Sequence, residues 1–232
     1  MPAVSEIQRL REIMARLRAP DGCPWDREQT HASLRPYMIE ECCEFLEAVD
    51  RGDLEHMCEE LGDVLLQVVF HAQLASEAGH FDFDDVARVI SDKLVRRHPH
   101  VFGETTVSSS GEVLRQWDQI KAAEKAERAA RRGESVPADE KAPLVKPMPG
   151  LLPALLRALD AYKQLVKRDA LPRGGLVDAE RIQALAAGLT PEEAGRRLFE
   201  IAAACRHAGI DPESALREHT QRVVEAAEAQ RE

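Results

Sequence analysis

The 232-residue sequence has few aromatic residues, no long apolar run and little sign of β-structure. Aromatic side chains make up 4% of the chain although 44% of it is hydrophobic, so its core must come mainly from aliphatic side chains and alanine. We find no alternating β-branched run and no Asn-Gly turn, which are the usual signals of strands and hairpins. No apolar stretch approaches the roughly 18 residues of a membrane-spanning helix. These absences predict an all-α protein with no membrane partner.

Basic residues are also in the minority. The 31 Lys and Arg against 41 Asp and Glu give a formal charge of −10, whereas binding to a nucleic-acid polymer needs clustered basic side chains. A small nucleotide, held by a local basic patch or through a metal, stays compatible with this charge. The five cysteines include no C-x-x-C pair, which is typical of reduced thiols. The chain opens directly into an amphipathic helix, and we therefore expect a soluble, cytoplasmic protein.

Two acidic segments, joined by a break at Arg51-Gly52, dominate the first third of the chain. Glu41 and Glu44 are three residues apart, as are Glu60 and Asp63, so each pair shares one face of a helix. If the two helices pack antiparallel across the break, the four carboxylates converge. Their mutual repulsion would be relieved by a divalent cation that prefers oxygen ligands, and Mg²⁺ is the obvious choice.

Solvated faces of ordinary acidic helices show the same spacing, and this is the alternative interpretation. The segment after Asp63, residues 64–70, is apolar around almost the whole helix circumference, and such a helix is buried on all sides. Gly62 fits a close approach of helices, despite a cost of about 1 kcal/mol relative to alanine. A metal-binding acidic cluster is therefore the preferred interpretation. The first acidic helix is expected from about Gln29, with Pro36 delaying or kinking its start.

Two further features suit a phosphorylated ligand, and each has a structural alternative. Lys93, Arg96 and Arg97 form one basic face at the end of a helix, suited to polyphosphate oxygens. Cations in a last helical turn also favour the helix macrodipole without any ligand. Trp25 falls in a segment expected to be a loop, where it could stack on a base or close the open end of the domain. The sequence leaves both roles of Trp25 open.

Prolines and glycines between residues 133 and 150 predict a linker. It would separate a helical domain of residues 1–132 from a second helical domain of residues 151–232. The second domain looks like a degenerate repeat of the first, but Arg196 stands where Asp63 stands in the first copy. We therefore expect a catalytic first domain and a non-catalytic second one.

At these residues the sequence resembles the MazG family of nucleoside triphosphate pyrophosphohydrolases, within the all-α NTP pyrophosphatases. The family pattern E-x2-E, a spacer and E-x2-D falls on Glu41, Glu44, Glu60 and Asp63. Family-like flanking segments surround it, and the resemblance extends from residue 1 to about residue 125. These segments are residues 23–26 (C-P-W-D), 62–65 (G-D-V-L), 81–83 (F-D-F), 93–102 (K-L-V-R-R-H-P-H-V-F) and 117–121.

The resemblance implies a four-helix-bundle-like first domain, a degenerate MazG-like second domain and assembly as a homodimer. It implies hydrolysis of a nucleoside triphosphate to the monophosphate and pyrophosphate, with water attacking the α-phosphorus and Mg²⁺, or Mn²⁺ as a substitute, required. The implied metal ligands are Glu41, Glu44, Glu60 and Asp63, with Glu40 as a further ligand or as the group that orients the water. The implied substrate-binding residues are Lys93, Arg96, Arg97 and Lys121 for phosphate and Trp25 for the base.

Two other functions stay open at this point. The enzyme could be a narrower pyrophosphatase that clears dUTP, dCTP or altered nucleotides from the nucleotide pool, which a substrate panel would reveal. Alternatively, the chain could be a helical protein that senses Mg–NTP without turnover. The degenerate second domain suits that second alternative, whereas the intact acidic pattern of the first domain argues against it.

Overall fold

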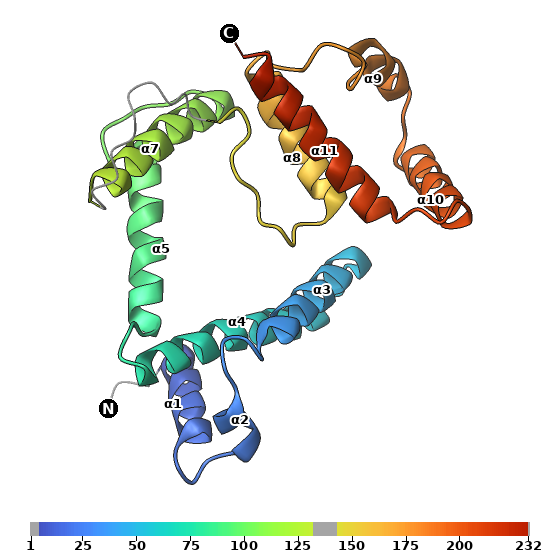
Figure 1. The fold of residues 1–232 in the computed structure, drawn as a ribbon. Coiled ribbons are helices and arrows are strands. Elements are labelled where there is room, and N and C mark those ends of the chain that lie inside the picture. The colour runs from blue at the N-terminus through green and yellow to red at the C-terminus, as the bar shows by residue number, and fades with distance from the viewer. Residues whose placement is uncertain (1–4, 132–142, 232) are drawn as a thin grey trace. The chain divides into compact units, whose positions relative to one another are not determined.

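The computed structural model describes residues 5–131 and 143–231, and within these ranges it contains helices and no strand. The all-α prediction is confirmed. The chain divides into two compact units, Met1–Glu134 and Ser135–Glu232, and most of the expected linker (residues 133–142) lies outside the described residues. The first unit contains α1 (Glu6–Arg18), α2 (Pro24–Glu28), α3 (Arg35–Arg51), α4 (Leu54–Glu77), α5 (Phe83–Arg97), α6 (Pro99–Phe102) and α7 (Ser110–Arg131) (Figure 1). The second contains α8 (Ala154–Lys167), α9 (Ala179–Ala186), α10 (Pro191–His207) and α11 (Pro212–Ala229).

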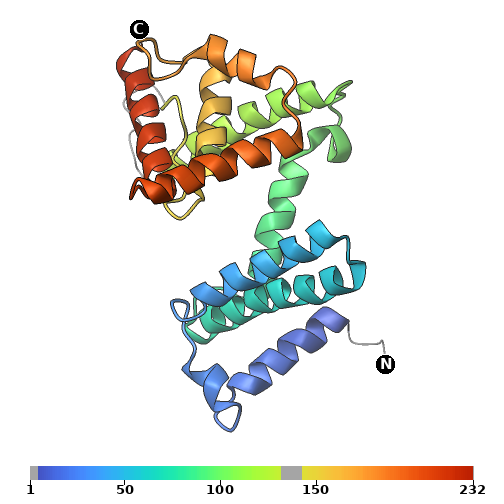
Figure 2. The same ribbon diagram turned by 90° about the vertical axis from the view of Figure 1, so that its right-hand side faces the viewer.

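An antiparallel hairpin of α3 and α4 is the centre of the first unit, and the two helices lie side by side in both ribbon views (Figures 1 and 2). Gly52 ends α3 in the left-handed conformation, with φ of 67°, which glycine adopts without a Cβ penalty. Asp53 then caps α4, because its side chain accepts a hydrogen bond from the His56 backbone N–H at 3.1 Å. This tight connection places the two acidic segments opposite each other.

The hydrophobic core of this unit lies toward the C-terminal half of α4. Met14 from α1 and Leu34 from the turn before α3 pack with Val69 and Phe70 of α4, and all four side chains are buried. The core therefore fixes one end of the hairpin, while the acidic residues occupy α4 nearer its N-terminus.

Two local predictions differ from the structure. Trp25 does not lie in a loop but in the short helix α2. Pro24 occupies the first helical position, where its fixed φ suits the start of a helix. Its missing N–H costs nothing there, because an N–H at this position has no partner within the helix. The first acidic helix begins at Arg35 rather than near Gln29, so the delayed start predicted from Pro36 is found. Thr30 and Ser33 form a local turn before it, in which each backbone N–H donates to the other's hydroxyl at 2.9 and 3.1 Å.

The all-round burial expected for α4 is only partly met within one copy of the chain. Val69 and Phe70 are buried, but Leu61 and Leu65 are 49% and 38% exposed. A Cβ placed on Gly62 would meet no atom within 4 Å. This surface of α4 is therefore open, and no helix among the described residues of the first unit approaches Gly62 closely.

The second unit is built on the pair α8 and α11, whose apolar faces bury Ala161, Leu165, Val223 and Ala227 together with residues 144–145. The repeated motif lies on α10. There Arg196 forms ion pairs with Glu193 at 2.7 Å and Glu200 at 2.5 Å. The arginine that replaces the motif's acidic residue thus neutralises the carboxylates around it.

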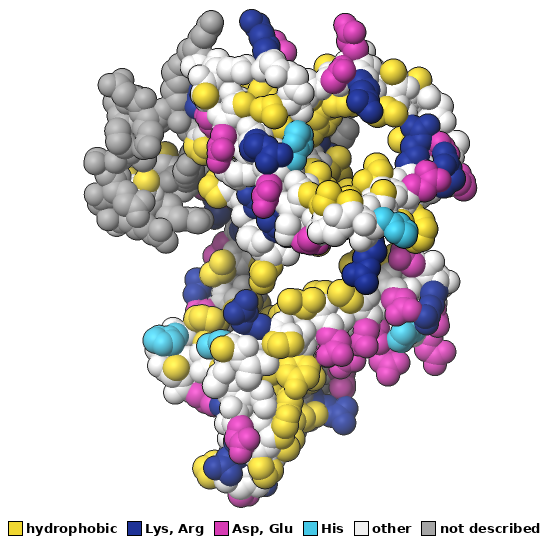
Figure 3. All heavy atoms as spheres, turned by 45° about the vertical axis from the view of Figure 1, so that its right-hand side comes forward, with side chains coloured by type: hydrophobic (Ala, Val, Ile, Leu, Met, Phe, Trp, Pro, Cys, Tyr) yellow, Lys and Arg dark blue, Asp and Glu magenta, His cyan; other side chains and the backbone are white. Residues whose placement is uncertain are grey.

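The five cysteines form no disulfide in the structure. None of the helices among residues 5–131 and 143–231 has the length and hydropathy of a membrane span. Acidic side chains gather over α3 and α4 with hydrophobic side chains beside them (Figure 3).

Candidate metal centre

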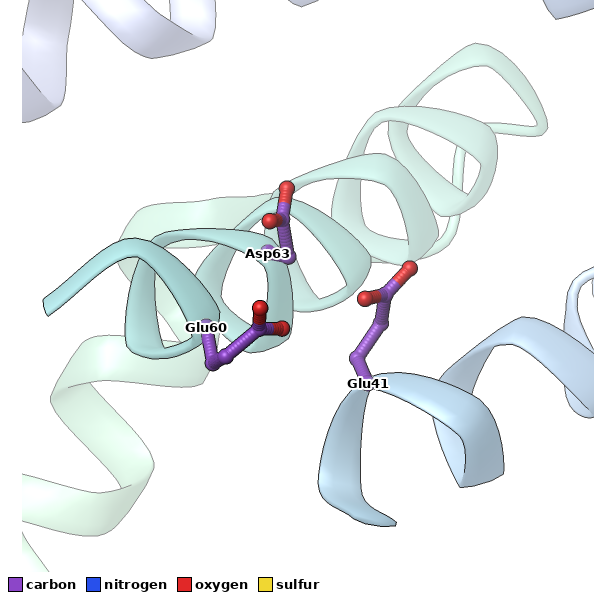
Figure 4. Close-up of side chains that lie close together, drawn as sticks. All are labelled: Glu41, Glu60 and Asp63. Atoms are coloured by element: carbon purple, nitrogen blue, oxygen red, sulfur yellow. The ribbon is translucent and has the colours of Figure 1, made fainter. Parts of the chain in front are cut away.

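Three of the predicted ligands meet across the α3–α4 hairpin. Glu41 comes from α3, and Glu60 and Asp63 come from α4; one carboxylate oxygen of each lies within 4.8 Å of the others. Figure 4 shows the three side chains turned toward one another. Antiparallel packing explains the arrangement, since Glu60 and Asp63 share the face of α4 that α3 covers. Carboxylate oxygens are the ligands that Mg²⁺ prefers, so the donor set fits a hard divalent cation.

Glu60 is the most buried member of this cluster, with 6% of its surface exposed. One carboxylate oxygen lies 2.8 Å from Nε2 of His56, one helical turn earlier, whereas the other is buried and has no hydrogen-bond partner within residues 5–131 and 143–231. An unpartnered buried carboxylate oxygen is costly unless a ligand supplies its missing contact. This oxygen is the strongest local sign of a cation site. His56 holds the carboxylate in place, a role that its spacing of four residues from Glu60 could have suggested.

The pKa of Glu41 reflects the negative charges close to it. Partial burial raises the pKa of Glu41, and the charges of Asp63, Glu44, Glu60 and Glu40 raise it further. Glu44 and Glu40 are exposed and lie outside the group of three, although both act on Glu41 electrostatically. Direct ligation by Glu44, and a role for Glu40, stay predictions.

Trp25 packs against the helix that carries Glu41. Its ring packs edge-on against Tyr37, with ring centres 5.8 Å apart, and 48% of its surface is exposed. Tyr37 precedes Glu41 by one turn of α3, so the aromatic pair borders the carboxylates. No motif or spacing in the sequence singles out Tyr37.

The structure does not bring the basic face to the carboxylates within one copy of the chain. Arg96 and Arg97 lie at the far end of α5, about 20 Å along that helix from its junction with α4. Both bind Glu124 of α7, at 2.7 and 2.6 Å. The hydrogen bond from Arg97, with another from Arg96, lowers the pKa of Glu124 to about 2. Glu124 therefore occupies the arginines that the sequence assigned to phosphate.

The two predicted lysines also belong to this distant region. Lys93 lies on α5 one turn before Arg97, and the Lys121 ammonium lies 5.7 Å from the ring centre of Trp117 on α7. Trp117 in turn packs edge-on against His98 at 5.0 Å. Phosphate binding by Lys93 and Lys121 stays a prediction.

Comparison with known proteins identifies the family. Residues 29–102 match the model of the MazG nucleotide pyrophosphohydrolase domain. The nucleoside triphosphate pyrophosphohydrolase/pyrophosphatase MazG of Thermotoga maritima is 44% identical over 227 residues, which span 94% of this chain and 82% of that protein. This chain belongs to the MazG family. The resemblance inferred from the acidic motif is therefore confirmed, and the chain is a member of an enzyme family.

Two more relatives were compared with the chain. The nucleoside triphosphate pyrophosphohydrolase of Escherichia coli is 41% identical over 233 residues, which span 94% of this chain and 84% of that protein. The uncharacterized protein YabN of Bacillus subtilis is 54% identical over 132 residues, or 57% of this chain and 27% of that protein. Two relatives thus match across both units, whereas YabN matches over little more than half of the chain.

Proposed function

We propose that this chain hydrolyses nucleoside triphosphates to nucleoside monophosphate and pyrophosphate in a reaction that requires Mg²⁺, with Mn²⁺ as a substitute. The observation that carries the proposal is the convergence of Glu41, Glu60 and Asp63, with one buried oxygen of Glu60 that has no hydrogen-bond partner in the described part of the chain. The names of the relatives from T. maritima and E. coli support the same activity. Free cysteines suit the cytoplasm, where we place the enzyme.

Glu41, Glu60 and Asp63 would hold the cation, with Glu44 as the further ligand. A bound cation would neutralise charge on the phosphates and lower the pKa of a coordinated water. Water attacks the α-phosphorus in line; a new P–O bond forms, the bond to the bridging oxygen breaks, and pyrophosphate leaves with the electron pair. Glu40, exposed beside Glu41, would orient the water and accept its proton. The Trp25–Tyr37 pair would flank the base.

We further propose that the enzyme is a homodimer. The α3–α4 hairpin contributes two helices, and a second copy would complete a four-helix bundle over the exposed leucines of α4. In the dimer, Glu124 would release the two arginines of α5. The polyphosphate would then be bound by Lys93, Arg96 and Arg97, with Lys121 nearby. The second unit, whose motif is neutralised by Arg196, has no catalytic role in this scheme.

The test is pyrophosphate release from the eight common NTPs and dNTPs, with Mg²⁺ and with EDTA. The proposal expects pyrophosphate and monophosphate in Mg²⁺ and neither product in EDTA, and the panel also separates a broad enzyme from one selective for dUTP or dCTP. Glu60→Gln should abolish release, while Glu55→Gln, an exposed glutamate in the first turn of the same helix, should leave it unchanged. Release of single phosphate, or activity that persists in Glu60→Gln, would contradict the assigned site.

A further inference from the structure

A line of polar side chains continues from the carboxylates along α4. Glu60, Gln67 and His71 are seven and eleven residues apart, close to two and three full turns, so they share one face of the helix. At a rise of about 1.5 Å per residue, Gln67 lies about 10 Å beyond Glu60 along the helix axis. The remaining residues from Val64 to Phe70 are apolar. Gln67 is therefore the one polar side chain in an otherwise apolar segment.

The far end of this line is marked by a histidine pair. Nδ1 of His71 lies 2.8 Å from Nδ1 of His31, and the two rings are stacked with their centres 5.0 Å apart. His31 precedes Glu41 by ten residues, just as His71 follows Glu60 by eleven, so both pairs obey one antiparallel register. The strip between α4 and the segment from His31 to Glu41 thus has carboxylates at one end and imidazoles at the other.

Gln67 sits between these ends with an unsatisfied hydrogen-bonding group. Gln67 is 5% exposed, and among the residues that the structure describes its Oε1 has no hydrogen-bond partner. A glutamine buried without a partner for its carbonyl is less favourable than the leucine or methionine that would fill the same space. A ligand that donates a hydrogen bond to this oxygen would explain why a glutamine stands here.

The neighbouring side chains indicate which kind of ligand. Tyr37 lies on α3 between His31 and Glu41 and carries the half-exposed Trp25 ring against it. Aromatic faces for stacking, a buried amide for hydrogen bonding and carboxylates for a metal-bound phosphate together match the three parts of a nucleotide.

We propose that Gln67 contacts the nucleoside part of the substrate and contributes to its selection. Its Oε1 accepts a hydrogen bond from an N–H or O–H group of the base or sugar, while the phosphates lie at Glu41, Glu60 and Asp63. The inference rests on the proposed nucleotide hydrolysis. It adds that the preferred substrates carry a hydrogen-bond donor on the base or sugar where the nucleoside meets Gln67.

The experiment compares wild type with Gln67→Met and Gln67→Leu, which keep the volume but remove the acceptor. Gln73→Leu is the matched control, because Gln73 lies on another face of α4 and donates to Glu77 at 2.9 Å. For each protein, kcat/KM is measured for eight NTPs and dNTPs, together with the inhibition constant of inorganic triphosphate, which has no nucleoside. Both Gln67 variants should lose about tenfold or more in kcat/KM for the best substrates and change the substrate ranking. Inhibition by inorganic triphosphate, and all values for Gln73→Leu, should stay unchanged.

An equal loss for all eight nucleotides and for inorganic triphosphate, or an unchanged ranking, would show that Gln67 only packs. A wild type that releases no pyrophosphate would refute the proposed activity but not this inference. In that case the inference is tested by calorimetry, which measures the binding of nucleoside 5′-monophosphates and of inorganic phosphate, each in Mg²⁺. Weaker nucleotide binding by Gln67→Met at unchanged phosphate binding supports the inference. No nucleotide binding by wild type, or equal weakening of both ligands, overturns it.

Discussion

Asp63→Asn should make the metal-free protein more stable and the metal-bound protein less so. The substitution keeps the shape of the side chain and removes one of three carboxylates whose oxygens lie within 4.8 Å of one another. Two like-charge pairs disappear with it, those to Glu41 and Glu60. The same change removes a metal ligand, so its effect on stability should reverse in sign when Mg²⁺ is added.

The magnitude follows from Coulomb's law. Two unit charges 4.8 Å apart repel by about 0.9 kcal/mol in bulk water and about 3.5 kcal/mol at an effective dielectric constant of 20. Because Asp63 and Glu41 are half-buried rather than fully buried, the lower figure is the better guide, and removing two pairs should add about 2 kcal/mol of stability in EDTA. For a chain of this length that corresponds to a Tm increase of about 4–8 °C.

Thermal unfolding followed by circular dichroism, in EDTA and in Mg²⁺, measures both effects. At a Mg²⁺ concentration of about 100 times Kd, the free energy of unfolding should rise by about 2.7 kcal/mol for wild type and by much less for Asp63→Asn. Asp50→Asn is the control, since Asp50 is exposed on α3, more than two turns from Glu41, and loses the same charge. If Asp63→Asn lowers Tm in EDTA, or if Mg²⁺ stabilises it as much as wild type, the three carboxylates do not form a strained metal site.

Three other substitutions test the structure elsewhere. Glu124→Gln should cost about 1–2 kcal/mol at pH 7 by weakening its contacts with the two arginines of α5. Because the folded pKa of Glu124 is about 2, below the ordinary value of 4.5, this stabilisation is present above pH 4.5 and is lost toward pH 2; denaturant titrations should show the two proteins converging there. Gly22→Ala should destabilise by about 2 kcal/mol or more, since its Cβ would lie 2.1 Å from the Leu17 carbonyl oxygen, and an unchanged denaturation midpoint would contradict this packing. Gly62→Leu should leave helicity unchanged but dissociate the proposed dimer, and light scattering that finds the wild-type mass in the variant would remove α4 from the interface.

The acidic centre could be predicted from the sequence because two local signals combine there. The three-residue spacing fixes the face of each helix, and the short break at Gly52 fixes the antiparallel pairing of α3 with α4. Together they bring Glu41 opposite Glu60 and Asp63. Glu44 shares a helix face with Glu41 but lies one turn closer to the break, so its partners across the hairpin precede Glu60. Spacing along one helix cannot show this difference, because it depends on the register between two helices.

The contacts of the basic face could not be predicted in the same way. Arg97 and Glu124 are 27 residues apart and belong to helices separated by α6 and a loop, so no periodic pattern links them. The His31–His71 contact is an intermediate case. Once the register of Glu41 against Glu60 is assumed, counting outward along both segments brings the two histidines together. Long-range contacts within a hairpin thus follow from one known pair, whereas contacts between separately connected helices do not.

The position of the core explains how the hairpin tolerates its acidic end. Burial of four large apolar side chains, Met14, Leu34, Val69 and Phe70, contributes about 1.5–3 kcal/mol each, which exceeds the repulsion of about 1 kcal/mol for each carboxylate pair. The core and the carboxylates lie at opposite ends of the strip between α3 and α4. Repulsion therefore acts mainly on the end nearer Gly52, away from these four large side chains. A cation bound by the carboxylates would join the two helices at that end, so metal binding and closure of the hairpin should be the same event.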